Sequence, residues 1–190
     1  MEDNIIMVDI RLNNEGKNLL KDLIGKKLIK YRHDPLDKFG GEMIYERVEL
    51  FFDDSTILVE YDYTPYPIFG SKDDEHPVFS IKRISSEDAV SALKDVSQIN
   101  VRYDKTITGI TLIEDHVEIE WNGKKDDIKF HKALIFEFGK EEIALQGDYM
   151  MPLLKIIKGE NSISKLLEPG DEFKDDPEVQ YSAQRFLIKL

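Results

Sequence analysis

The sequence predicts an α+β protein: an antiparallel β-sheet made of two related, hairpin-containing halves, with a few short helices. Three observations predict this fold class. Two twelve-residue stretches are spelled alike, runs of alternating apolar and polar residues recur along most of the chain, and apolar residues at helical spacing occupy only short segments. Alternation is the pattern of a half-buried strand, whereas i, i+3, i+4 spacing is that of an amphipathic helix.

The repeated stretch predicts the two halves. Residues 52–63 read FDDSTILVEYDY and residues 138–149 read FGKEEIALQGDY; both fit F-x-x-x-x-I-x-[VL]-x-x-D-Y, 86 positions apart. An alternating apolar run precedes each copy, and Glu46 and Lys132 interrupt the two runs at the same place. A chance match between two ordinary hairpins is the alternative, but a hairpin does not require the final Asp-Tyr. We therefore predict a duplication: one domain, residues 1–190, built of two pseudo-repeats at about 26–84 and 97–168.

Each copy is expected to form a half-buried hairpin. A four-residue loop, a common length built around a type I turn, would place Phe52 opposite Ile57. Side chains alternate between the two faces of a strand. One face of the first hairpin is then apolar, with Val48, Leu50, Phe52, Ile57, Val59 and Tyr61. The other is polar, with Arg47, Glu49, Glu60 and Asp62. A lone hairpin is marginal in water, so the two copies should face each other or join one sheet.

The remaining elements of the first half follow from local signals. Residues 5–12 predict a strand, and Asn13 or Asn14 caps a helix that ends near Gly25. Residues 27–32 predict a short strand, and residues 33–41, with a proline and a glycine pair, a loop. Residues 64–77 hold three prolines and a glycine and should be irregular. A strand over 78–84 and a helix over 86–96 complete this half, the helix linking it to the second.

The second half is richer in strand signals. Residues 99–103, 107–113 and 116–121 predict strands. Asn122-Gly123 predicts a tight hairpin, because a type I′ turn needs a positive φ at both central residues. This turn places Asp126 opposite Ile119, so we expect that end of the hairpin to be exposed or bulged.

Helices are expected toward the C-terminus. Pro152 can begin a helix that Gly159 closes, and residues 162–167 predict a second, short one. Asp176 and Pro177 then predict a final helix, with one apolar face made of Val179, Ala183, Phe186, Leu187 and Leu190. A strand over residues 184–190 is the competing interpretation.

Length and composition exclude several classes of protein. A chain of 190 residues is one domain or two small packed halves, and 41% hydrophobic residues suffice for a core. The absence of cysteine excludes disulfides and a thiol nucleophile. The first residues are acidic where a signal peptide is basic, and no apolar run approaches the length of a membrane span. We therefore predict a cytoplasmic protein that does not bind membranes.

The charge bears on possible partners. A formal net charge of −12 disfavours nucleic acid, which requires a basic surface. It allows electrostatic steering toward cationic partners, although simple solubility is the favoured explanation of the charge. No phosphate-binding loop, nucleophile elbow or zinc signature occurs. We accordingly predict no catalytic residue, no metal and no cofactor.

Two sparse groups of side chains could nevertheless carry chemistry. His116, which flanks Asp115 and Glu118, and His131 on the opposite strand could form a His/His/carboxylate cluster; the alternative is two surface histidines on the polar face of a sheet. The repeated Asp62 and Asp148 could face each other across a pseudo-twofold axis and share a proton or bind a cation. The alternative there is that each aspartate anchors a turn through backbone N–H groups.

The loop after the first hairpin is the best local candidate for partner binding. It sets Tyr66 and Phe69, as apolar anchors, beside the acidic Asp73, Asp74 and Glu75. The sequence thus predicts a non-enzymatic binding protein whose acidic surface docks a basic protein partner, as an inhibitor or immunity-type protein docks a basic toxin. The alternatives are a small-molecule-binding or hydrolytic domain with its site between the halves, and a structural subunit that assembles through a hairpin edge. No oligomeric state is predicted.

Overall fold

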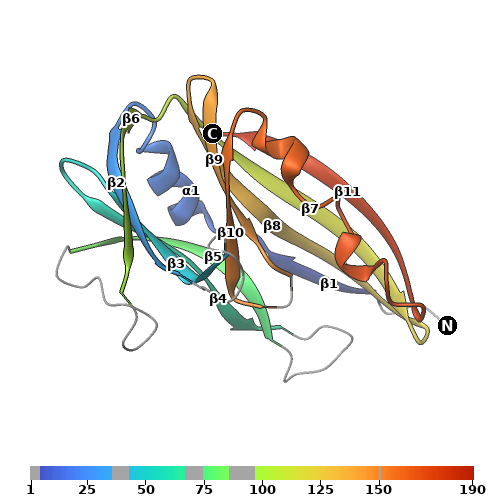
Figure 1. Ribbon diagram of the computed structural model, residues 1–190. Helices are drawn as coiled ribbons and strands as arrows, with labels where there is room; N and C mark the ends of the chain where they lie inside the picture. Colours follow the sequence, from blue (N-terminus) through green and yellow to red (C-terminus); the bar gives the residue numbers. More distant parts are fainter. Residues whose placement is uncertain (1–4, 36–42, 67–74, 86–96, 150) are drawn as a thin grey trace.

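Eleven strands of the described chain form a single curved sheet (Figure 1). The computed structural model describes residues 5–35, 43–66, 75–85, 97–149 and 151–190. Two four-stranded meanders make up most of the sheet. The first is β2 (Lys27–Pro35), β3 (Met43–Phe51), β4 (Thr56–Pro65) and β5 (Glu75–Ile84); the second is β7 (Gly109–Trp121), β8 (Lys124–Phe138), β9 (Glu141–Gly147) and β10 (Leu153–Gly159). The other elements are β1 (Ile5–Ile10), β6 (Ile99–Thr106), β11 (Val179–Lys189), α1 (Asn14–Lys21) and the 3₁₀ turns η3 (Ser162–Lys165) and η4 (Asp171–Phe173).

The two meanders join where β10 pairs with β9 on one side and with the start of β3 on the other. The main path through the sheet is β11-β7-β8-β9-β10-β3-β2-β6, with β4 and β5 continuing from β3 and β1 added to β8. Every pairing is antiparallel except that of β1 with β8. The protein is therefore mostly antiparallel β-sheet. The predicted α+β class fits only loosely, because α1 is the one α-helix in the described ranges and has eight residues.

The β3–β4 and β8–β9 hairpins have the same register. Leu50 pairs with Ile57, and the residues 86 positions further along, on β8 and β9, pair in the same way. The predicted pairing of Phe52 with Ile57 is wrong by two residues. The Phe52 N–H donates to the Ser55 carbonyl oxygen over 2.9 Å, so the turn is tighter than the predicted four-residue loop. The loop between β8 and β9 holds two residues rather than four. The predicted apolar face is confirmed, since all six of its residues in the first hairpin are buried.

The second strand of each meander is irregular at the polar residue that breaks its apolar run. On β8 the pairing with β7 skips Lys132. On β3, Glu46 has a φ of 57° and lies between the part paired with β10 and the part paired with β4. Because an extra residue reverses the alternation of a strand, Phe130 does not join Leu134 and Phe136 in the main core but packs in a separate cluster.

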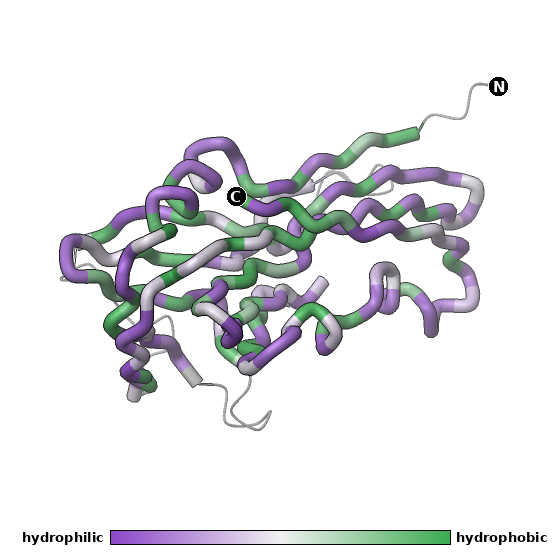
Figure 2. The backbone as a smooth tube through the Cα atoms, turned by 90° about the horizontal axis from the view of Figure 1, so that it is seen from above, coloured by the Kyte–Doolittle hydropathy of each residue, from purple (hydrophilic) through white to green (hydrophobic). Residues whose placement is uncertain are grey.

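The main core lies inside the curve of the sheet, where α1 fills the space between the two meanders (Figure 1). The Asn13 side chain accepts a hydrogen bond from the Gly16 N–H over 2.8 Å and caps α1 as predicted. Leu20 and Leu23 are buried against the sheet. The apolar faces of both hairpins meet in this core, and apolar and polar residues alternate along most strands that line it (Figure 2).

Two predicted helices are strands instead. The segment after Pro152 forms β10, and the C-terminal segment forms β11, which pairs with β7 from Val179 to Lys189. The competing strand interpretation is therefore confirmed, and the strand begins earlier than residue 184. Tertiary pairing decides both cases: β10 is flanked by two strands, and the apolar residues of β11 that coincide with a helical face also fit an alternating edge strand.

The tight hairpin at Asn122-Gly123 is confirmed. Both residues have positive φ, 51° and 74°, and the flanking residues pair. Asp126 lies opposite Ile119 as predicted, but both are buried and unbulged, with exposures of 1% and 2%. The expectation of an exposed or bulged end is wrong, because β1, β11 and η4 cover this part of the hairpin.

Other predictions concern the first half and the connecting segments. The strands expected over 5–12, 27–32 and 78–84 correspond to β1, β2 and β5, although β2 extends through Pro35 into the predicted loop. β4 and β5 likewise extend into the stretch expected to be irregular, as far as Pro65 and from Glu75. The predicted helix over 86–96 lies outside the described residues. No helix in the described ranges is long and apolar enough to span a membrane.

Candidate functional site

The β7–β8 hairpin extends beyond the main core and, with β1 and β11, forms one end of the sheet. β9 pairs with β8 only from Ala133 onward, so the first half of β8 is left to pair with β1, while β11 covers the other side of β7. We call this part, β1 with residues 114–121 of β7, residues 124–131 of β8 and the adjoining β11, the distal sheet. It projects toward the end of the molecule at which the N-terminus lies (Figure 1).

A hollow of about 440 Å³ lies at the end of the distal sheet. All four strands contribute to its lining: Ile5, Glu118, Ile119, Glu120, Lys125, Asp126, Asp127, Gln180, Tyr181 and Ser182. Three of these carboxylates, those of Glu118, Glu120 and Asp127, share one face of the sheet with Lys125, whereas Asp126 is buried on the face of Ile119. This volume falls in the range of about 300–1,000 Å³ that ligand sites occupy.

The charges at the hollow are only loosely neutralised. Glu120 lies 3.7 Å from Lys125, and Asp127 lies 3.9 Å from Lys129, and both separations are long for ion pairs. Glu118 accepts a hydrogen bond from the Ser182 hydroxyl over 3.3 Å. Partly exposed pairs of this kind contribute little energy, so these carboxylates can exchange their contacts for those of an incoming cation.

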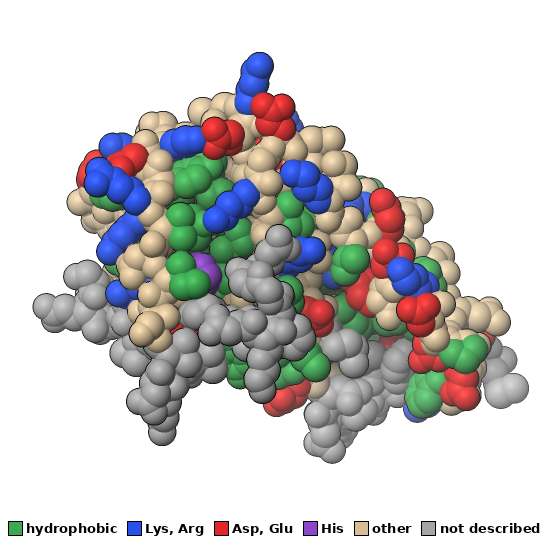
Figure 3. Space-filling view, viewed as in Figure 1, with side chains coloured by type: hydrophobic (Ala, Val, Ile, Leu, Met, Phe, Trp, Pro, Cys, Tyr) green, Lys and Arg blue, Asp and Glu red, His purple; other side chains and the backbone are tan. Residues whose placement is uncertain are grey.

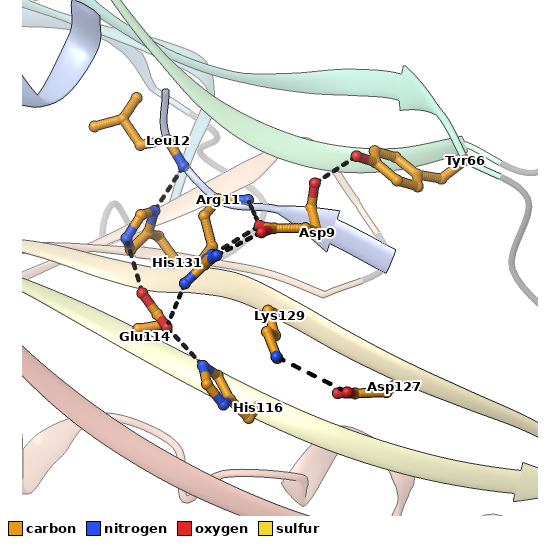
Figure 4. Close-up of polar contacts among 9 residues, drawn as sticks. All are labelled: Asp9, Arg11, Leu12, Tyr66, Glu114, His116, Asp127, Lys129 and His131. Atoms are coloured by element: carbon orange, nitrogen blue, oxygen red, sulfur yellow. Dashed lines mark hydrogen bonds and ion pairs between the residues drawn. The ribbon is translucent and has the colours of Figure 1, made fainter. Parts of the chain in front are cut away.

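A second group of polar side chains, centred on Glu114, lies where β1 meets β7 and β8 (Figure 4). Glu114 Oε1 accepts from Arg11 Nη1 over 3.0 Å and lies 2.6 Å from His116 Nε2. Arg11 also forms a two-pronged pair with Asp9 through Nε and Nη2. Burial would raise the pKa of the Glu114 carboxyl, but the hydrogen bonds from His116 and Arg11 outweigh it and hold this pKa below its usual range. Glu114 is therefore ionised at neutral pH.

His131 completes this group from β8. Its Nδ1 accepts a hydrogen bond from the Leu12 N–H over 2.7 Å, so the neutral ring carries its proton on Nε2. That atom lies 3.7 Å from Glu114 Oε2. Burial, together with the nearby Lys17 charge, lowers the pKa of His131 to about 4. The ring is thus neutral and points at an ionised carboxylate.

The His/His/carboxylate cluster considered from the sequence therefore forms, but its carboxylate is Glu114 rather than the neighbouring Asp115 or Glu118. The alternative of two surface histidines is wrong for His131, which is 2% exposed. Every member contacts another strand, so the cluster fastens β1 to β7 and β8. In the described ranges no three His, Asp or Glu side chains are arranged to hold a metal ion.

Two buried ion pairs on the opposite face of the sheet were missed by sequence reasoning. Arg185 binds Asp115 with two hydrogen bonds of 2.7 Å and also donates to the Leu167 carbonyl oxygen. Lys132, at the β8 bulge, pairs with Glu172. The available signal was a charge inside an apolar alternation, as with Asp115 between Ile113 and Val117. Both pairs attach the segment carrying η3 and η4, or β11, to the sheet.

The predicted partner-binding residues are only partly described. Tyr66 donates from its hydroxyl to the Asp9 carbonyl oxygen over 2.6 Å, which links the end of β4 to β1 of the distal sheet. Glu75 is exposed at the start of β5. Phe69, Asp73 and Asp74 lie outside the described residues.

The repeated aspartates anchor backbone rather than each other. Asp148 Oδ1 accepts from the Met151 N–H over 3.0 Å, and Asp62 Oδ1 accepts from the Tyr63 N–H over 2.7 Å. This confirms the predicted turn anchor for Asp148, whereas Asp62 lies within β4 and accepts only from the next residue of that strand. Asp148 also lines a hollow of about 150 Å³ at the β10–β3 junction, together with Met43, Gln146, Lys155, Lys165 and Leu167. Comparisons with family models, curated proteins and solved structures find no match to this chain.

Proposed function

We propose that the protein is a non-enzymatic binding protein that docks a basic segment of a partner protein in the hollow of the distal sheet. The observation that carries the proposal is the composition of this hollow: three carboxylates on one face, those of Glu118, Glu120 and Asp127, with one lysine, beside a space of about 440 Å³. Lysine or arginine side chains of a partner would replace the long contacts that these carboxylates now make. Such pairs gain strength when the surrounding contact excludes water.

Apolar side chains at the hollow offer the second half of a binding surface. Ile5 is 56% exposed and Tyr181 is 39% exposed, and both line the hollow. Interfaces commonly combine an apolar centre with a polar rim. Acidic side chains gather toward this end of the molecule in the space-filling view (Figure 3). A net charge of −12 would speed encounter with a cationic partner.

The proposal also includes the partner-binding residues predicted from the sequence. The described chain leaves β4 at Tyr66, which is bonded to β1, and resumes at Glu75. We therefore include Tyr66, Phe69, Asp73, Asp74 and Glu75 as a second set of contacts to the same partner. An inhibitor or immunity-type role against a basic toxin suits this chemistry, and a reading frame for such a toxin beside the gene would support it.

The chain offers an intrinsic probe for a binding test. Trp121 is the only tryptophan, and it follows Glu120 of the hollow directly. A synthetic peptide of alternating lysine and leucine, with a glutamate–leucine peptide as control, can be titrated while Trp121 emission is recorded. We expect a saturable change with the lysine peptide only, weakening as ionic strength rises because exposed charges are screened.

Two matched triple variants distinguish binding at the hollow from a general effect of the protein's negative charge. The combination Glu118→Gln, Glu120→Gln and Asp127→Asn should weaken lysine-peptide binding at least tenfold. The combination Asp53→Asn, Glu160→Gln and Asp175→Asn removes the same three charges at exposed positions elsewhere and should leave the affinity within about twofold. If both sets of substitutions weakened peptide binding equally, the binding would be an unspecific attraction between charges and the proposal would be wrong.

The alternative function, a small-molecule or hydrolytic site between the halves, has one supporting observation. The hollow beside Asp148 lies where β10 joins the first meander. Its 150 Å³ is smaller than the usual size of a ligand site, so we rank it second. Electron density for a small molecule beside Asp148 in crystals soaked with fragments would reverse this ranking.

We also infer that the two meanders arose by duplication. The common register of their central hairpins and the backbone irregularities at Glu46 and Lys132 support this inference, because neither is required for a meander. Related sequences provide the test. Both copies of the Asp-Tyr ending and both irregularities should recur in them, and relatives in which only one half carries these features would argue for chance.

A further inference from the structure

β11 is an open edge of the sheet along its whole length. It pairs with β7 over eleven consecutive residues without a shift in register, and no other strand of the described chain pairs with its second side. Such an edge presents a row of backbone N–H and C=O groups that can pair with another strand. Proteins commonly blunt such edges with prolines, bulges, charges or short strands.

The other outer strands of the described chain carry these protective features, and β11 does not. β6 shifts its register against β2, and its Asp104 has a φ of 57°. β5 contains Pro77, and β1 has only six residues. β11 has no proline and no bulge, and the one charge near its centre, Arg185, is already held by Asp115.

β11 also exposes large apolar side chains to solvent. Tyr181 is 39% exposed, Phe186 is 41% exposed and Leu187 is 55% exposed. Tyr181 and Leu187 lie on one face of the strand, and Phe186 lies on the other, where its ring stacks at 4.5 Å from that of His116. A strand added beside β11 would cover apolar side chains on both faces.

We propose that this strand is the β11 of a second copy of the chain, paired antiparallel about a twofold axis at Gln184. In that register Tyr181 lies opposite Leu187 of the partner, and Ser182 lies opposite the partner's Phe186. Each contact occurs twice, as a twofold interface requires. The two sheets become one continuous sheet, and both open edges disappear.

The charges of the strand favour a second copy over an unrelated strand. Glu178 precedes β11 and Lys189 ends it, so antiparallel pairing brings each next to the opposite charge of the partner. Moving the axis by one residue to Arg185 would instead place two arginines opposite each other, which is unfavourable. The net charge of −12 on each copy opposes association, but at physiological salt it is screened beyond a Debye length of about 8 Å.

The absence of cysteine from the chain allows a test of both the pairing and its register. Residues directly opposite in an antiparallel pair have Cα atoms about 4.5–5.5 Å apart, within the range that a disulfide spans. Gln184→Cys would place two thiols on the axis, whereas Ser182→Cys would place them four residues apart. Both positions are exposed, so neither change should disturb folding.

We expect the native protein to show twice the chain mass of 22.1 kDa by light scattering at high concentration and physiological salt. Under mild oxidation Gln184→Cys should become a covalent dimer and Ser182→Cys should not. Leu187→Glu should abolish the native dimer, and its combination with Tyr181→Lys should restore it, because the new charges then lie opposite each other. A single-chain mass at every concentration, or cross-linking at residue 182 in preference to 184, would overturn the proposal.

Discussion

The ring of Tyr61 on β4 lies directly against Gly147 on β9, the residue 86 positions further along the chain. A Cβ atom added at Gly147 would lie 2.3 Å from Tyr61 Cζ. The Tyr61 hydroxyl continues past it and donates to the Asp148 carbonyl oxygen over 2.6 Å. Positions 86 residues apart in the two hairpins therefore touch, and the large side chain at one position faces a glycine at the other.

The first prediction is that Gly147→Ala destabilises the protein by about 1–3 kcal/mol, because the added methyl group overpacks the Tyr61 ring. Urea unfolding followed by circular dichroism measures this. Gly109→Ala is the matched control: its Cβ would meet the Glu137 carboxylate at 2.8 Å, and a flexible side-chain end can move aside. A similar cost for both changes would contradict the close contact. In the combination with Tyr61→Leu, the cost of Gly147→Ala should largely vanish.

The second prediction concerns the two apolar faces that meet in the main core. Leu50 and Phe136 occupy equivalent positions and are 4% and 2% exposed. Truncating either to Ala should cost about 2–5 kcal/mol through lost burial and the cavity left behind. Met7→Ala, at a position 69% exposed, should change stability by less than about 0.5 kcal/mol. The free energies of unfolding in urea test this prediction. A loss of less than about 0.5 kcal/mol at Leu50 or Phe136 would show that the buried and exposed faces are assigned the wrong way round.

The third prediction is a loss of stability in mild acid caused by His131. Its pKa falls from the ordinary 6.5 to about 4 on folding, so the unfolded chain binds the proton more readily. The stabilisation is complete above pH 6.5 and is lost progressively as pH falls toward 4, by an amount on the order of 2–3 kcal/mol. Comparison with His131→Gln isolates this contribution from that of other groups. Parallel pH–stability curves for the two proteins between pH 6.5 and 4.5 would contradict it.

The fourth prediction concerns the buried pair of Asp115 and Arg185. Arg185→Met leaves a fully buried carboxylate without its cation and should cost about 3–5 kcal/mol. Replacing Asp115 by Leu in the same chain removes the stranded charge and should recover most of that loss. Thermal or urea unfolding of the two variants provides the measurement, and a double variant no more stable than the single one would show that the pair has another role.

Local pattern was sufficient for the strands that alternate cleanly. The first hairpin, the Asn-Gly turn and the α1 cap follow from periodicity and from the φ that a turn requires, and both are local properties. The C-terminal segments differ, because Leu153 and Val179 belong to stretches whose spacing suits a helix as well as a strand. Only the neighbouring strands β3, β9 and β7 decide between them, and these lie far away in sequence.

The candidate site was harder to predict for the same reason. Its lining comes from β1, β7, β8 and β11, so it combines Ile5 with Tyr181, which lies 176 positions further along the chain. The histidine pair could be anticipated because the tight turn at Asn122 brings its two strands together. The carboxylate between the two histidines could not be anticipated, because the bulge at Lys132 determines that Glu114 pairs with His131.

The double pairing of β10 has a kinetic consequence. Each meander closes through contacts between neighbouring segments, whereas Tyr45 of β3 meets Leu153 of β10 across more than half of the chain. Closing so long a loop is entropically costly and slow, since folding rates fall as contacts become less local. The meanders should therefore form first and the β3–β10 seam last. Destabilising changes in that seam would then accelerate unfolding and leave the refolding rate almost unchanged.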